Sequence, residues 1–185
     1  MSNYRRNYIK GGSYFFTVVT EKRRAILNSD LARECLRNAF RHCMQELPIK
    51  IDAMVMMPDH IHAIWTLPDN DLDYSKRWGI IKKHFTQSWL DQGGSEVSLS
   101  KSKQKYRRRG IWQRRFWEHT LRDQTDYNQH FDYLHYNPIK HGLVKNLSDY
   151  PYSSFHRYVN QGVYKEDWGM QYEPYFDFSD LNTLE

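Results

Sequence analysis

The chain has 185 residues, of which 26% are charged, with a formal net charge of +5 and a pI of about 9.1. That length suits one ordinary domain. The mean hydropathy of −0.87 excludes a membrane protein, the N-terminus lacks the apolar stretch of a signal peptide, and two cysteines are too few for a disulfide scaffold, so we expect a cytoplasmic protein.

The basic balance is combined with many aromatic residues, which make up 16% of the chain and include 14 Tyr and 6 Trp. Lysine and arginine neutralise phosphates, and aromatic faces stack on unpaired bases. This composition favours a nucleic-acid partner, although a positive charge of this size is also found in ordinary soluble proteins.

The first half of the chain predicts a strand, a helix and a hairpin. A strand is expected over residues 13–20, which are dense in aromatic and β-branched side chains. A helix follows from the Ser29-Asp30 cap to Pro48, because apolar residues recur there at three- and four-residue spacing. Strands over 50–57 and 60–67, joined at Pro58-Asp59, should form an antiparallel hairpin.

The second half predicts a helix over 73–90, a loop over 91–110, a short strand over 111–120, and a helix from Asp123 to Asn137 that Pro138 ends. The order βαββαβ indicates an α+β, ferredoxin-like fold, with an antiparallel sheet and helices on one face. We expect residues 1–145 to form this domain and residues 146–185 a C-terminal appendage packed on or near it.

One candidate site lies on the predicted strand over 60–67. His60 and His62 are two residues apart, so their imidazoles project from the same face of the strand. Two neutral imidazoles on one face are a natural start for a divalent-metal site. By itself, however, a His-x-His pair more often consists of surface or core histidines.

A second candidate site lies on the last predicted helix, where Tyr133 and Asn137 are four residues apart and share a face. A tyrosine can attack a phosphate, and an amide oxygen can ligate a metal ion. Taken alone, this pattern favours a packed aromatic residue. Tyr136 and, less so, Tyr127 are the alternative nucleophiles on the same helix.

The best candidates for contact with a DNA backbone are basic residues, with one interleaved tryptophan. For any single residue, a solvated loop position is about as good an interpretation; as a group they favour a DNA groove. They are Arg5, Arg6, Lys82, Lys83, Arg107, Arg108, Arg109, Trp112, Arg114 and Arg115.

Together the His-x-His strand and the Tyr-x-x-x-Asn helix resemble the HUH single-tyrosine transposases, and within them the REP-associated tyrosine transposases. The resemblance extends in order over about residues 4 to 158. It also includes the segments Tyr4-Arg5-Arg6, Gly11-Gly12-Ser13-Tyr14-Phe15-Phe16-Thr17, Trp112-Gln113-Arg114-Arg115-Phe116-Trp117-Glu118-His119 and Tyr136-Asn137-Pro138-Ile139-Lys140-His141-Gly142.

The resemblance implies a transposase-type DNA endonuclease that acts on single-stranded or hairpin DNA at palindromic REP-type elements. It implies that Tyr133 is the nucleophile, forming a 5′-phosphotyrosine, and that His60, His62 and Asn137 hold Mg²⁺ or Mn²⁺. More distant relatives commonly have Gln in place of Asn137, which supplies the same ligand on a longer arm. A monomer is favoured over a homodimer.

Two other functions remain open at this point. The first is a hairpin-binding protein without nuclease activity, although all the catalytic positions are filled. The second is a metal hydrolase that uses His60, His62 and a third histidine, although the sequence contains no H-E-x-x-H motif.

Overall fold

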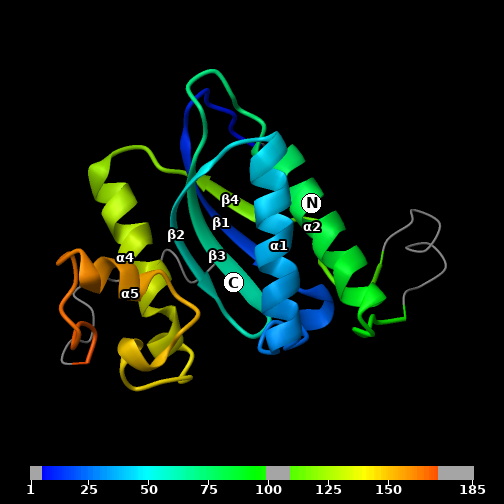
Figure 1. Ribbon diagram of the computed structural model, residues 1–185. Coiled ribbons are helices and arrows are strands. Elements are labelled where there is room, and N and C mark those ends of the chain that lie inside the picture. The colour runs from blue at the N-terminus through cyan, green and yellow to red at the C-terminus, as the bar shows by residue number, and fades with distance from the viewer. Residues whose placement is uncertain (1–5, 99–108, 171–185) are drawn as a thin grey trace.

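The computed structural model describes residues 6–98 and 109–170. Its centre is a four-stranded antiparallel sheet in the order β2-β3-β1-β4 (Figure 1). The strands are β1 (Ser13–Val19), β2 (Lys50–Met56), β3 (His60–Thr66) and β4 (Trp117–Thr120). The predicted α+β, ferredoxin-like fold is thereby confirmed.

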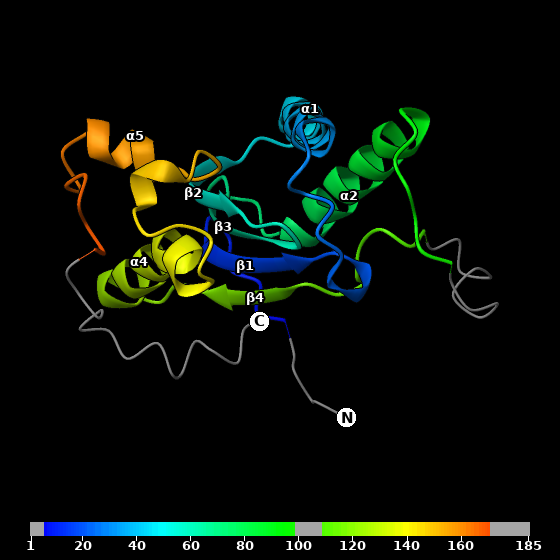
Figure 2. The same ribbon diagram turned by 90° about the horizontal axis from the view of Figure 1, so that it is seen from below.

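The helices α1 (Asp30–Glu46) and α2 (Tyr74–Asp91) cover one face of the sheet (Figures 1 and 2). Each begins where its sequence predicts, because the side chains of Ser29 and Asp73 accept hydrogen bonds from backbone N–H groups of the first turn. The core beneath them is rich in aromatic rings, such as Trp65 of β3 stacked on Trp78 of α2 at 4.4 Å. No helix among the described residues has the length and apolar composition needed to cross a membrane.

The opposite face of the sheet is covered by α4 (Gln124–Lys140), which joins α5 (Phe155–Asn160) and the short 3₁₀ turn η2 (Leu147–Asp149) in a second core (Figure 2). The chain between these elements continues along the edge of β2. Ser153 pairs with Val55, and the Tyr150 hydroxyl donates to the Met56 carbonyl at 2.7 Å. The described part of the C-terminal segment therefore packs on the same sheet that carries α4.

Two elements differ from their predicted extents. The last strand is shorter, since Thr20 and Trp112 form only an isolated bridge and the chain leaves the sheet at the exposed Arg114 and Arg115 before β4 begins. The last helix is longer, running through Pro138 to Lys140. Proline fixes a helical φ and removes only one hydrogen bond, and Pro138 is buried, so its packing offsets that loss near the helix end.

Candidate active site

The two histidines of β3 lie side by side beneath α4. Both side chains point to the α4 face of the sheet, as the alternation of the strand predicts, with ring centroids 4.7 Å apart. They are 1% and 0% exposed for His60 and His62 respectively. Phe15 of the neighbouring strand β1 stacks on His62 at 5.2 Å, so an apolar wall flanks the pair.

Each histidine is oriented by a neighbouring polar side chain. Nδ1 of His60 lies 2.6 Å from Oδ1 of Asp59, whose Oδ2 accepts from Arg23 at 2.9 Å. Burial acts to raise the pKa of Asp59, but the contacts with His60 and Arg23 outweigh it and lower the pKa. The ionised carboxylate can only accept, so the hydrogen of His60 is on Nδ1 and the lone pair is on Nε2. Nδ1 of His62 lies 2.9 Å from the Thr17 hydroxyl.

The third component is α4, which presents Tyr133 and Asn137 to the histidines. Both side chains are fully buried. The Tyr133 ring lies 5.6 Å from His62 and 6.0 Å from Phe15, centroid to centroid. Nδ2 of Asn137 donates to the Tyr133 carbonyl at 2.9 Å, which fixes the amide with its oxygen directed away from that bond.

These side chains fit a divalent metal ion. Within the described residues, Nε2 of His60 and Oδ1 of Asn137 are buried polar atoms without a hydrogen-bond partner. On α4, Asn137 lies between Tyr133, which contacts His62, and His141, whose ring is 5.4 Å from His60. Two imidazoles and an amide oxygen, with outer partners that fix the rings, suit Mg²⁺ or Mn²⁺. His141 is the rival to Asn137 as third ligand.

Lys140 is a functional candidate that sequence reasoning missed. Its ammonium donates to the Tyr133 hydroxyl at 3.2 Å and lies 4.9 Å from the centre of that ring. The two residues are seven apart, which places them on one face of a helix two turns long. The spacing was available in the sequence, but only to an interpretation that continues the helix past Pro138.

The two alternative tyrosines face other parts of the molecule. Tyr136 packs edge-on against Trp168, with ring centroids 6.3 Å apart. Tyr127 lines a pocket of about 930 Å³ with Tyr158 and Tyr164, and burial raises its pKa. Only Tyr133 of the three has a ring contact with a histidine of β3 within the described residues.

The predicted DNA-binding residues are distributed over several places. Arg6, Lys82, Arg114 and Arg115 line one pocket between α2 and β4. Lys83 is exposed on α2. Arg5, Arg107 and Arg108 lie outside the described residues.

Two other members of that group are engaged within the protein. Arg109 forms a forked ion pair with Glu96, with N–O distances of 2.6 and 2.8 Å. Trp112 is only 8% exposed and packs against Phe85 at 4.9 Å, so it belongs to the core and is not placed to stack on a base. The interleaving of Trp112 with arginines in the sequence is thus a feature of packing.

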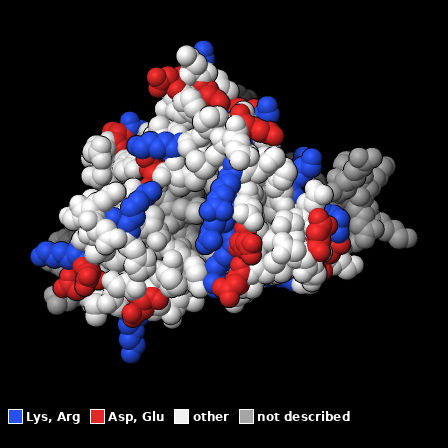
Figure 3. All heavy atoms as spheres, viewed as in Figure 1, with Lys and Arg blue, Asp and Glu red and all other residues white. Residues whose placement is uncertain are grey.

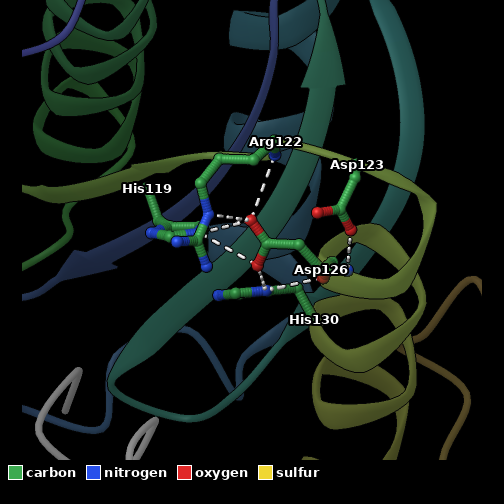
Figure 4. Close-up of polar contacts among 5 residues, drawn as sticks. All are labelled: His119, Arg122, Asp123, Asp126 and His130. Atoms are coloured by element: carbon green, nitrogen blue, oxygen red, sulfur yellow. Dashed lines mark hydrogen bonds and ion pairs between the residues drawn. The ribbon is translucent and has the colours of Figure 1, made fainter.

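A separate polar cluster lies where α4 begins. One ligand atom from each of His119, Asp126 and His130 lies within 4.8 Å of the others, which is close enough to hold a metal ion. Figure 4 shows both imidazoles and the Arg122 guanidinium converging on the Asp126 carboxylate. Nε2 of His119 is 2.9 Å, and Nε of Arg122 also 2.9 Å, from Oδ2 of that carboxylate.

The hydrogen bonds of this cluster favour a structural role. Nδ1 of His130 lies 2.8 Å from the backbone carbonyl of Asp126, which can only accept, so that nitrogen carries the hydrogen and has no lone pair to offer a metal ion. The carboxylate accepts from His119 on β4 and from Arg122 before α4. The cluster therefore joins the first turn of α4 to the edge of the sheet.

Replacing Asp126 with Asn should lower the free energy of unfolding by about 2 kcal/mol at neutral pH. Burial alone would raise the pKa of Asp126, but the hydrogen bonds from Arg122 and His119 lower it to about 2. A depressed pKa stabilises the fold above the unfolded value near 3.8, and this contribution is lost as the pH falls toward 2. Denaturant titrations of both proteins should therefore converge below about pH 4; a constant difference down to pH 2 would contradict this assignment.

Comparisons with known proteins agree with this arrangement. The model of the family described as "Transposase IS200 like" matches residues 8–137. A REP-associated tyrosine transposase of Escherichia coli K12 is 45% identical over 168 residues, covering 91% of both chains. A Haemophilus influenzae protein named as a transposase of the same kind is 46% identical, over 91% of this chain and 94% of its own.

A solved structure of a REP-associated tyrosine transposase bound to a REP hairpin superposes with a TM-score of 0.76. It is 44% identical to this chain and is matched over 91% of both chains. The family model includes β1, both histidines of β3, Tyr133 and Asn137. The chain therefore belongs to the IS200-like transposase family and, within it, to the REP-associated tyrosine transposases.

Proposed function

We propose that this protein is a metal-dependent endonuclease and strand transferase that cuts single-stranded DNA beside palindromic hairpins through a 5′-phosphotyrosine. The observation that carries the proposal is the placement of the Tyr133 ring against His62, with Lys140 on its hydroxyl and Asn137 one turn away. The hairpin partner is inferred from the relative of 44% identity that was solved with a REP hairpin.

His60, His62 and Asn137 would hold the metal ion. When bound, Mg²⁺ or Mn²⁺ polarises the scissile phosphate and neutralises charge that develops on its oxygens. The protein's own part is to keep these ligands in place: Asp59 and Thr17 fix the two imidazoles, and the Tyr133 carbonyl fixes the Asn137 amide. Their burial limits access of bulk water to the reacting atoms.

Tyr133 supplies the attacking oxygen. Its hydroxyl loses a proton and forms a bond to the scissile phosphorus, while the bond from phosphorus to the 3′ oxygen breaks and that oxygen leaves as a protonated 3′-OH. The DNA downstream stays attached to Tyr133 through its 5′ phosphate. Attack by a 3′-OH reverses the step, so the strand can be resealed or joined to another end without an external energy source.

Lys140 is positioned to favour the ionised form of the attacking oxygen. A free tyrosine has a pKa near 10, so a phenolate is scarce at neutral pH. An ammonium group 3.2 Å from the hydroxyl oxygen stabilises the negative charge as the proton leaves. We therefore propose Lys140 as a catalytic residue that acts on the nucleophile.

Lys140→Met should slow cleavage by about 100-fold, because methionine keeps the length of the side chain and removes its charge. Single-turnover rates measured against pH give a readout that a purely structural role would not change. The rate of Lys140→Met should rise with pH where the wild-type rate is flat, since hydroxide then ionises the phenol, and Lys140→Arg should restore part of the activity. Wild-type rates and pH profile for Lys140→Met would exclude this role.

The proposed function is tested by incubating the protein with a labelled hairpin oligonucleotide that has single-stranded flanks, in the presence of Mn²⁺. We expect a covalent protein–DNA band that resists denaturation and requires the metal ion. Tight hairpin binding with neither cleavage nor a band would indicate a catalytically silent binding protein. Cleavage without a band would indicate that water is the nucleophile.

A further inference from the structure

The pocket between α2 and β4 has a volume of about 570 Å³ and gathers basic side chains from three separate segments. Lys82 comes from α2, Arg6 from the segment before β1, and Arg114 and Arg115 from the chain that enters β4. Phe116 lies among them, with the Arg6 guanidinium 4.4 Å and the Lys82 ammonium 5.4 Å from its ring centre. This group of residues is called the α2–β4 pocket below.

The α2–β4 pocket has a strong excess of positive charge. Its one carboxylate, Glu118, is 1% exposed and is contacted by the Tyr74 hydroxyl at 3.2 Å and by Arg6 at 3.7 Å. Within the described residues, Lys82, Arg114 and Arg115 have no carboxylate within ion-pair distance. The Lys82 ammonium donates to the Gln113 carbonyl at 3.0 Å. Three cations thus converge without an internal counter-charge.

The condition of Lys82 supports an anionic ligand. Burial, with the charge of Arg6 adding to it, lowers the pKa of Lys82 to about 8. The charged groups around it are Arg6, Arg114, Arg115 and Glu118. An anion bound among them would favour the protonated lysine, because it replaces the solvation that burial removes. Guanidinium groups and a lysine are the usual donors to backbone phosphates.

The α2–β4 pocket and Tyr133 lie on opposite faces of the sheet. Glu118 is paired with Phe16, which belongs to the core under α1 and α2. The alternate residue His119 is paired with Phe15, whose ring contacts Tyr133 on the α4 side. β4 is the edge strand between the two sites. DNA that reaches both sites must therefore cross the edge of β4.

We infer that the α2–β4 pocket binds backbone phosphates of the DNA that flanks the cleavage site, so that one bound DNA molecule passes around the edge strand β4 with the scissile phosphate on the opposite face. The inference rests on the proposed function, because it takes DNA as the substrate. Trp117 and His119 are partly exposed on the α4 side of that edge and have parallel rings 5.8 Å apart, so they offer a surface on which an unpaired base can stack.

The first test compares binding of the hairpin oligonucleotide at several salt concentrations. Arg114→Gln/Arg115→Gln should weaken binding at least about 10-fold and reduce the slope of log K against log salt by one to two, roughly one for each lost phosphate contact. Both arginines are exposed, so the fold should be unaffected. The matched control is Arg37→Gln/Arg41→Gln, which removes the same charge from exposed positions of α1, where basic side chains form a column down the middle of the view in Figure 3.

An unchanged slope for the Arg114/Arg115 variant, or an equal loss in the α1 control, would overturn the inference. Lys82→Arg supplies a second measurement. Wild-type affinity should fall between about pH 7 and pH 9 as Lys82 loses its proton, and the arginine variant should abolish that fall, since arginine stays charged. Failure of the proposed function is a separate result: the wild-type protein would then give no covalent band with any DNA.

The crossing of β4 is tested with Arg115→Cys. The two natural cysteines, Cys35 and Cys43, are buried, so the introduced thiol is the accessible one. Hairpin oligonucleotides with a thiol tether at one phosphate each should form disulfides at positions displaced from the cleavage site. Crosslinking at the scissile phosphate itself would place Arg115 on the same face as Tyr133 and contradict the inference.

Discussion

Tyr133→Phe should abolish both cleavage and the covalent adduct while leaving hairpin affinity and the fold nearly unchanged. The substitution removes one oxygen and keeps the ring that packs against His62 and Phe15. The lost contact is the hydrogen bond from Lys140, which is worth about 1 kcal/mol or a little more for a charged donor. Gel assays with single-turnover kinetics measure the first effect, and a thermal melt measures the second.

Tyr136→Phe is the matched control, because it makes the same change three residues further along the same helix. Tyr136 packs against Trp168 instead of a histidine, so we expect wild-type cleavage from this variant. Wild-type cleavage by Tyr133→Phe, together with loss of activity in Tyr136→Phe, would transfer the role of nucleophile to Tyr136.

His62→Ala should reduce metal affinity and cleavage together by more than about 100-fold, since even outer partners of metal ligands contribute 10- to 100-fold. Hairpin binding should persist, because the basic residues lie elsewhere. Isothermal titration with Mn²⁺ measures the affinity. Because His62 is fully buried and alanine leaves a cavity, His60→Gln provides a second variant that keeps more of the side-chain volume.

His119→Ala is the control for metal binding, since His119 belongs to the second group that could hold an ion. We expect it to retain Mn²⁺ affinity and lose only some stability. Loss of the ion in His119→Ala but not in His62→Ala would move the metal to the start of α4. Asn137→Ala and His141→Gln, compared in the same titration, decide which residue is the third ligand.

The fold and the histidine pair could be predicted because their signals are local. Alternation along a strand puts His60 and His62 on one face regardless of tertiary context, and the caps at Ser29 and Asp73 fix where two helices begin. Burial of Tyr133 against His62 required the structure, because no sequence pattern states which face of the sheet a helix will cover.

The misses have physical causes that can be named. Ending the last helix at Pro138 removed Lys140 from the face of Tyr133, although a proline three residues from a helix end costs only one hydrogen bond. Trp112 was grouped with DNA-binding arginines, yet an aromatic residue between charges can equally fill a core, as it does here.

Convergence in space was also beyond sequence reasoning. Arg6, Lys82 and the Arg114-Arg115 pair are far apart in the chain, and only the packing of α2 beside β4 assembles them into one pocket. The polar cluster of Asp126 with two histidines likewise joins a strand to a helix. A sequence can identify the cations and the histidines, but it does not show which of them meet.

The most direct test of the central claim is mapping of the covalent adduct by mass spectrometry. Wild-type protein is trapped on a hairpin oligonucleotide with Mn²⁺, digested, and sequenced by fragmentation. The modified peptide should contain Tyr133, with the nucleotide joined through its 5′ phosphate to the phenol oxygen. An adduct on Tyr136 or Tyr127, or cleavage with every tyrosine unmodified, would contradict the assignment of Tyr133 as the nucleophile.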